Sequence, residues 1–184
     1  MGFHTFDPAE TDRLEDPTRF RFCSREELLQ WLPTGREANI LDVGSGSGFY
    51  TDEIAPFVGH MVALDVQPEM HAQYRERGLP DNVAPVTADA ESLPFDSDTF
   101  DGTFSTMTFH ESATDDSVAE LARVLAPGGR AVIVDWSAEG NGEAGPPRSE
   151  RYDLDRAQVF LSEAGFEVEV GAERSETFAV VATV

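Results

Sequence analysis

The chain has 184 residues, with 35 acidic side chains against 13 basic ones and a formal net charge of −22. This length suits one domain with a buried core, and the lack of a cationic footprint excludes a typical nucleic-acid binder. No apolar run reaches the length of a membrane span, and the single cysteine, Cys23, excludes an internal disulfide framework. We therefore expect a cytoplasmic protein that binds neither nucleic acid nor membrane.

The acidic residues are spread along the whole chain and alternate with apolar residues, and the sequence contains no lysine. This distribution argues against an acidic disordered tail and favours adaptation to concentrated salt, where the screening length falls to about 3 Å. The missing lysines fit this habit and also fit a GC-rich genome. The charge thus indicates the solvent rather than the substrate.

Two short helical pieces are expected before residue 39. One covers 24–32, where Ser24 is the N-cap and Glu27 completes a capping box. We expect residues 1–38 to form a helical leader or lid and residues 39–184 to form the main domain.

From residue 39 onward, short β-rich runs alternate with helical stretches, which predicts a parallel sheet covered by helices. The expected strands are 39–43, 61–65, 83–87, 100–106 and 130–135, and the expected helices are 48–57, 68–77 and 115–125. Pro127-Gly128-Gly129 is expected to stop the third of these helices and to turn into the fifth strand.

The end of the chain breaks this alternation. An amphipathic helix ends at Gly165, and the runs 167–170 and 177–184 are expected to form a hairpin at the sheet edge. The fold class is therefore α/β, a Rossmann-like doubly wound, mostly parallel seven-stranded sheet with an antiparallel C-terminal hairpin strand. Such an edge could pair two copies into a homodimer.

The stretch "ILDVGSGSGFY" leads from the first expected strand into three glycines, Gly44, Gly46 and Gly48. Without β-carbons, these residues let the backbone turn tightly and approach a ligand closely. A P-loop is excluded because no Gly-Lys-Ser/Thr follows, whereas a dinucleotide-binding loop stays open at this point.

Three acids distinguish the remaining ligands. Asp42, Asp65 and Asp89 lie at or just after the ends of the first three expected strands. Carboxylates beside the loop would repel a pyrophosphate and attract a cationic ligand. A positive centre, a ribose and an adenine amino group would satisfy this set, and S-adenosylmethionine (SAM) has all three.

The sequence resembles the class I SAM-dependent methyltransferases, and within them the small-molecule, methyltransferase type 11-like group. Four stretches carry the resemblance in order, from residue 39 to residue 136: "ILDVGSGSGFYT", "VALDVQPEM", "VTADAESLPFDSDTFDGTFSTMTFHE" and "LARVLAPGGRAVIVDW". The resemblance implies that 39–184 is a SAM-binding domain.

The resemblance also implies a role for individual residues. Asp65 would bind the ribose hydroxyls, and Asp89 would accept the adenine amino hydrogen. The full set of implied cofactor-binding residues is Asp42, Gly44, Ser45, Gly46, Ser47 and Gly48 along the methionine part, Asp65 at the ribose, Val66, Met70, Asp89 and Ala90 at the adenine, and Met107 near the sulfonium.

His110 and Glu111 lie just beyond the fourth expected strand and Asp135 ends the fifth, and these three are the candidate catalytic residues at the acceptor site. A general base is needed only where the acceptor carries a proton. Glu111 could instead cap the helix that starts near residue 115, and His110 could serve packing. His4 is a further polar candidate.

No spacing of histidines, acids or the cysteine suggests a metal site. Cys23 lies outside the motifs, so a nucleophilic role is not expected. An apolar acceptor pocket could use Trp136, Phe3, Phe6 and Phe109, although aromatic residues at strand ends are more often part of the core.

The sequence thus predicts a SAM-dependent methyltransferase that acts on a small molecule by in-line displacement. One alternative is a nucleotide-binding oxidoreductase, against which Asp42, Asp89 and the Gly-x-Gly-x-Gly spacing argue. The other is a non-catalytic SAM-binding or interaction protein, which product formation would distinguish.

Overall fold

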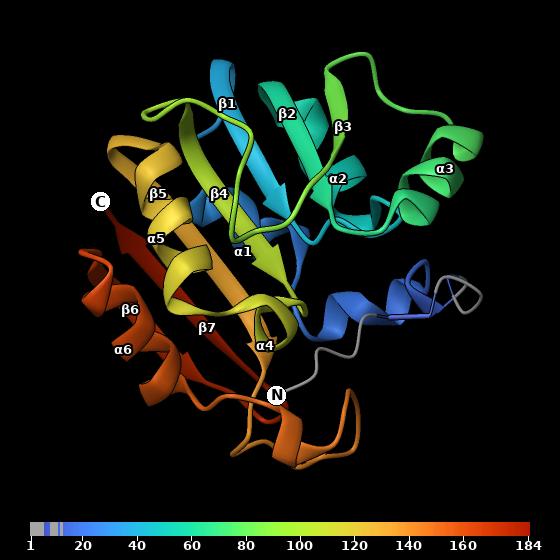
Figure 1. Cartoon of the computed structure of the whole chain (residues 1–184). Helices are drawn as coiled ribbons and strands as arrows, with labels where there is room; N and C mark the ends of the chain where they lie inside the picture. Colours follow the sequence, from blue (N-terminus) through green and yellow to red (C-terminus); the bar gives the residue numbers. More distant parts are fainter. Residues whose placement is uncertain (1–5, 8–10, 12) are drawn as a thin grey trace.

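The computed structural model describes residues 6, 7, 11 and 13–184, and in it a seven-stranded sheet is covered by helices on both faces (Figure 1). The strands are β1 (Gly35–Val43), β2 (Val58–Asp65), β3 (Val83–Thr87), β4 (Phe100–Thr106), β5 (Leu125–Trp136), β6 (Glu167–Glu173) and β7 (Thr177–Thr183). The helices are η2 (Pro17–Arg21), α1 (Arg25–Trp31), α2 (Phe49–Ile54), η3 (Ala55–Phe57), α3 (Pro68–Arg77), α4 (Phe109–Ser112), α5 (Asp115–Val124), η4 (Arg148–Glu150) and α6 (Leu154–Glu163).

The strand order is β3-β2-β1-β4-β5-β7-β6. Strands β1 to β5 pair in parallel, whereas β7 is antiparallel to both β5 and β6. The order reverses between β1 and β4, and ligands bind beyond the carboxyl ends of strands at such a reversal. The predicted Rossmann-like, mostly parallel sheet with an antiparallel C-terminal hairpin is confirmed.

Side chains along the central strands alternate between two cores. Ile40 belongs to one core with residues of α1 and α2, whereas its neighbour Leu41 belongs to the other with residues of α5 and α6. A strand buried on both faces reads as a continuous apolar run, as expected for a parallel sheet. The two cores fix the sheet between its helices and hold the carboxyl ends of β1, β2 and β4 at one edge.

Strands β1, β2 and β5 all begin before the expected residues, and the difference is largest in β5. Residues 127–129 were expected to form a turn before the strand, but β5 already begins at Leu125. Here Gly128 N donates to the carbonyl of Val184, and Val184 N donates to the carbonyl of Gly129. Leu125 itself pairs with Phe100 of β4, and the register between the two strands shifts between Phe100 and Gly102.

Helix starts follow local capping chemistry. Ser24 and Glu27 form the expected capping box of α1, with Ser24 N 3.0 Å from Glu27 Oε2. Helix α5 is capped by Thr114 together with Ser117, so the alternative that Glu111 caps this helix is wrong. Instead Glu111 lies in α4, a short helix that the sequence did not predict.

Helix α4 and the N-terminal segment, meaning the described residues before α1, both lie at the carboxyl ends of the strands. In Figure 1 the blue N-terminal segment passes close to the ends of β1 and β4, with α4 beside it. Within the described part of the chain, the helices are too short or too polar to cross a bilayer.

Candidate functional site

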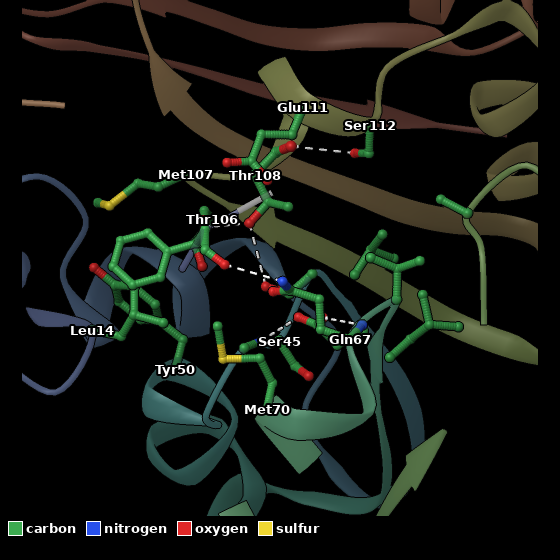
Figure 2. A pocket seen from close by; sticks show the side chains of 18 of the residues that line it. Leu14, Ser45, Tyr50, Gln67, Met70, Thr106, Met107, Thr108, Glu111 and Ser112 are labelled. Carbon is green, nitrogen blue, oxygen red and sulfur yellow. Dashed lines mark hydrogen bonds between the residues drawn. The ribbon is translucent and has the colours of Figure 1, made fainter. Parts of the chain in front are cut away.

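A cavity of about 270 Å³ opens at the reversal point of the sheet. Its wall combines the glycine loop after β1, the ends of β2 and β4, the segment after β3, helix α4 and part of the N-terminal segment. Figure 2 shows Ser45, Gln67 and Met70 on one side of this space, and Met107, Thr108 and Glu111 on the other.

The glycine loop follows the end of β1 with a backbone that side chains would obstruct. Gly44, Gly46 and Gly48 all have positive φ angles, of 74°, 55° and 92°. A Cβ at Gly44 would lie 2.2 Å from the Thr108 side chain, and one at Gly48 would lie 2.3 Å from the Tyr74 ring. The absence of a side chain at Gly44 thus lets Thr108 pack against the loop in the cavity wall, and its absence at Gly48 lets α2 pack on Tyr74 of α3.

Asp65 ties this loop to the end of β2. Its Oδ2 accepts a hydrogen bond from Gly46 N at 2.8 Å, and its Oδ1 accepts one from Gln67 N at 2.9 Å. Burial raises the pKa of the Asp65 carboxyl, while the two backbone donors act in the opposite direction. The carboxylate is thus fixed at the floor of the cavity with unused acceptor capacity.

Asp42 lies beneath the loop and does not line the cavity. Its Oδ2 accepts a hydrogen bond from Thr51 Oγ1 at 2.6 Å, and its Oδ1 is buried without a partner among the described residues. Burial raises the pKa of this carboxyl to about 7. The buried hydroxyl of Ser45, which does line the cavity, also lacks a partner in the part of the chain that the structure describes. An unmet polar group of this kind in a cavity wall fits a polar ligand.

The end of the cavity opposite α4 lies beside the carboxyl ends of β2 and β3. Val66 is half exposed and Met70 is buried, so together they present an apolar surface at the start of α3. Asp89 is exposed, and its Oδ1 accepts a hydrogen bond from Glu91 N at 3.0 Å. Ala90 lies between these two acids in the same wall. A flat apolar ring with a polar edge fits this end.

Glu111 enters the cavity from α4, and a histidine and an aspartate stand behind it. Glu111 Oε1 lies 3.7 Å from His110 Nε2, and His110 Nδ1 lies 2.9 Å from Oδ1 of the fully buried Asp135. Asp135 also accepts hydrogen bonds from the backbone nitrogens of His110 and Trp136. Of the three side chains, only that of Glu111 lines the cavity.

Charges in this group act on one another. Burial lowers the pKa of His110, but the Asp135 and Glu111 carboxylates outweigh it, so the pKa is raised. Burial raises the pKa of Glu111 to about 7; Asp135 and Asp65 add to this, and His110 opposes it. A carboxyl with this pKa exchanges its proton near neutral pH.

The N-terminal segment closes one side of the cavity. The guanidinium of Arg19 donates to the carbonyl of Leu14 at 2.7 Å and lies 3.8 Å from the sulfur of Met107. It also lies over the rings of Phe49 and Tyr50, at 5.1 and 5.2 Å from their centroids. Arg19 is therefore a fixed cation in the cavity wall.

A second contact fastens this segment to the glycine loop. The hydroxyl of Ser47 donates to the carboxylate of Glu15, which also pairs with Arg77 of α3. Leu14 approaches the loop as well, since a Cβ at Gly46 would lie 3.3 Å from its side chain. The segment thus lies on the loop through both apolar and charged contacts.

Comparison with known proteins decides the family. The family described as "Methyltransferase domain" matches residues 41–133, which include the glycine loop, Asp65, Asp89 and α4. The chain belongs to this methyltransferase family. Its prediction as a class I SAM-dependent methyltransferase is confirmed at the level of family and fold.

Similar proteins agree with this assignment. A SAM-dependent methyltransferase from Aquifex aeolicus has 32% sequence identity and a TM-score of 0.86, and the match covers 98% of this chain and 100% of that one. A Haloferax volcanii methyltransferase, solved in complex with the activator Trm112, has 19% identity, covers 98% and 99% of the two chains, and shares the fold with a TM-score of 0.81.

Curated relatives match over shorter regions. The biotin biosynthesis bifunctional protein BioHC of Cellvibrio japonicus is 38% identical over 109 residues, which are 58% of this chain and 22% of that protein. The ubiquinone/menaquinone biosynthesis C-methyltransferase UbiE of Idiomarina loihiensis is 36% identical over 112 residues, 55% of this chain and 44% of that protein. The chain thus spans less than half the length of these two relatives.

The structure brings most of the expected cofactor residues to one cavity. Nine line it: Gly44, Ser45, Gly46, Asp65, Val66, Met70, Asp89, Ala90 and Met107. Three others support the loop from outside the lining: Asp42, Ser47 and Gly48. Met107 has a positive φ of 59°, which is uncommon for a residue with a side chain and marks a constrained position in the wall.

The expected aromatic acceptor pocket does not form as a group. Phe6 lines the cavity, but Phe109 is buried in the core against Tyr152 and Phe160. Trp136 packs edge-on against Phe22. Phe3 and His4 lie outside the described residues.

Cys23 is fully buried, and burial raises the pKa of its thiol to about 12, in keeping with the expectation that it is no nucleophile.

Arg19, Leu14 and Gln67 line the cavity although the sequence did not identify them. Gln67 lies two residues after Asp65, and its Nε2 donates to the carbonyl of Phe6 at 3.0 Å. The signal for Arg19 was weak, because an arginine in a short segment before the first strand has no motif around it. Only the folding of this segment over the loop places its charge in the wall.

Proposed function

We propose that this methyltransferase transfers a methyl group from SAM to a small-molecule acceptor. The observation that carries the proposal is the cavity at the sheet reversal. It combines a glycine loop, a fixed carboxylate at Asp65, and an apolar surface of Val66 and Met70 beside the carboxylate of Asp89. SAM supplies, when bound, a methyl group on a positively charged sulfur that is ready for displacement.

The residues present fit this cofactor. Asp65 keeps acceptor capacity for a ribose diol, and Val66 and Met70 form an apolar surface on which an adenine ring could pack. Asp89 would accept from the adenine amino group and Ala90 N would donate to the ring. The glycine loop would follow the methionine part, with Asp42 beneath the loop, Ser47 joining it to Glu15 of the N-terminal segment, and Met107 near the sulfur.

Arg19 completes the set with the charge that the other residues lack. Among the described residues that line the cavity, it is the single cation, against the carboxylates of Asp65, Asp89, Glu91 and Glu111. The methionine part of SAM carries one carboxylate, and a guanidinium is well suited to bind it by two hydrogen bonds. We therefore assign the methionine carboxylate to Arg19.

A small acceptor suits the enclosure of the cavity. The N-terminal segment lies directly on the loop through Leu14 and Glu15, which leaves limited room beside the cofactor. A protein or nucleic acid would need a wider opening, and a nucleic acid would also need a cationic surface, which 13 basic against 35 acidic residues do not provide. Residues 1–38 would thus act as the lid over the acceptor.

The same proposal extends to the surroundings of the protein. The acidic surface and the absence of lysine suit concentrated salt, and a cytoplasmic location suits a SAM-dependent reaction. The exposed strand β6 at the sheet edge could pair two copies as a homodimer.

Label transfer tests the proposal. The protein is incubated in molar KCl with methyl-labelled SAM and an extract from the organism that makes it, divided into metabolites and macromolecules. The label is expected in a metabolite, and Asp65→Ala should abolish this transfer while Asp116→Ala, an exposed acid on α5, should leave it unchanged. Label in the macromolecular fraction alone would contradict a small acceptor.

A further inference from the structure

Glu111 is set apart from the other acids of the cavity by its position. Asp65 ends β2 and Asp89 and Glu91 follow β3, at the end assigned to ribose and adenine. Glu111 comes from α4 on the other side, and Figure 2 shows it above Thr108, on the same side of the cavity as Met107. A carboxylate on this side faces the region where the sulfur and the acceptor would meet.

Burial shows that Glu111 is no ordinary surface acid. Its side chain is 23% exposed, whereas acids that only solvate a surface remain largely in water. Burying a carboxylate is costly unless another group compensates it. The compensating group is His110, whose Nε2 faces Glu111 Oε1 at 3.7 Å.

His110 is itself held in one orientation. Its Nδ1 lies 2.9 and 3.0 Å from the two oxygens of Asp135, and Asp135 is fixed by two backbone nitrogens. With Nδ1 committed to Asp135, Nε2 is left to interact with Glu111. The three side chains thus interact in the order Asp135, His110, Glu111, and of the three only Glu111 reaches the cavity.

We propose that Glu111 faces the methyl-transfer position and takes a proton from an amine acceptor that binds as its ammonium form, with His110 and Asp135 as positioning residues. This proposal rests on the proposed function. The acceptor N–H bond breaks and its proton passes to a Glu111 oxygen, which frees the nitrogen lone pair. The N–C bond then forms as the S–C bond of the donor breaks, and that electron pair stays on sulfur.

The charge balance favours an ammonium over other acceptors. With Arg19 assigned to the methionine carboxylate, no other cation of the described wall remains to bind an anionic acceptor. The Glu111 carboxylate would repel an anion and attract an ammonium. A thioether or a tertiary amine would give Glu111 no proton to take.

A pair of cofactor analogues probes this position without knowledge of the acceptor. S-adenosylhomocysteine lacks the methyl group, and sinefungin carries a C–NH3⁺ group in place of the methylated sulfur. If Glu111 faces this position, the protein should bind sinefungin roughly tenfold or more tightly than S-adenosylhomocysteine, as expected for a hydrogen bond between charged groups. Calorimetric titration in molar KCl measures both affinities.

Variants locate the preference. Glu111→Gln should bring the two affinities close together, and Glu111→Asp should leave a reduced preference. Glu91→Gln, which removes another acid of the same wall, should keep the wild-type preference. A preference that survives Glu111→Gln would overturn the proposal.

The pH dependence of the wild type gives a test that needs no variant. The groups that face Glu111 are His110 beside it, Asp135 behind His110, and Asp65 across the cavity. Because the pKa of Glu111 is about 7, the preference for sinefungin should grow as pH rises from 6 to 8 and Glu111 ionises. An aliphatic ammonium stays protonated over this range.

His110→Asn should move the midpoint of this pH profile upward, because the histidine favours the ionised form of Glu111. A merely structural role for His110 would leave the midpoint in place. Equal, pH-independent affinities for the two analogues in the wild type would refute the proposal for Glu111 alone. Failure to bind S-adenosylhomocysteine at all would instead refute the proposed function.

Discussion

Arg19→Gln tests the assignment of the one cation in the described cavity wall. The guanidinium is fixed by the Leu14 carbonyl at 2.7 Å and by the rings of Phe49 and Tyr50. Because it is already ordered, little conformational entropy is lost when a carboxylate binds. A hydrogen bond to a charged group contributes about 1.5–3 kcal/mol, which corresponds to a loss of roughly 10- to 150-fold in affinity on its removal.

Calorimetric titration with two ligands separates this effect from a general disturbance. S-adenosylhomocysteine has the carboxylate, whereas 5′-methylthioadenosine lacks the whole amino-acid part. Arg19→Gln should weaken the first by the stated factor and the second hardly at all. Arg21→Gln, two residues away on η2 and outside the cavity wall, should affect neither ligand. Equal losses for both ligands in Arg19→Gln would refute the assignment.

The remaining predictions concern stability. Gly48→Ala should lower the free energy of unfolding by about 2–4 kcal/mol, because its Cβ would lie 2.3 Å from the buried Tyr74 ring at a φ of 92°. Gly78→Ala, at a φ of 98° with open space around it, should cost only the backbone part, and equal losses in denaturant titrations would refute the clash. For Asp42, a folded-state pKa of about 7 against an ordinary 3.8 means that protonation stabilises the fold. As pH falls from 8 to 5, the wild type should therefore gain on the order of 2 kcal/mol relative to Asp42→Asn, and a pH-independent difference would contradict this.

Local chemistry explains which parts of the fold the sequence predicted. Strands β3 and β4 and helix α3 begin and end where expected. Pro68 starts α3 and Gly78 ends it, and polar turns border the two strands. Strand β5 begins early because Leu125 pairs with Phe100 of β4, and because Gly128 and Gly129 form backbone hydrogen bonds with Val184 near the other end of the sequence. Such long-range pairing leaves no local signal.

The candidate site shows the same division. Gly44 follows β1 and Asp65 ends β2, so their motif indicated neighbouring positions at one edge of the sheet, and both line the cavity. The roles of the two residues toward a cofactor remain predictions. Arg19 escaped detection because the contact of the N-terminal segment with Met107 depends on packing between distant residues. His110 was expected in the acceptor site, and only the folded arrangement shows that it stands behind Glu111.

Titration of the wild-type protein with S-adenosylhomocysteine and with NAD, both in molar KCl, tests the central claim most directly. The carboxylates of Asp65 and Asp89, with Arg19 reserved for a single carboxylate, predict micromolar binding of S-adenosylhomocysteine and none of NAD. Binding of NAD alone would contradict the assignment of this cavity to SAM.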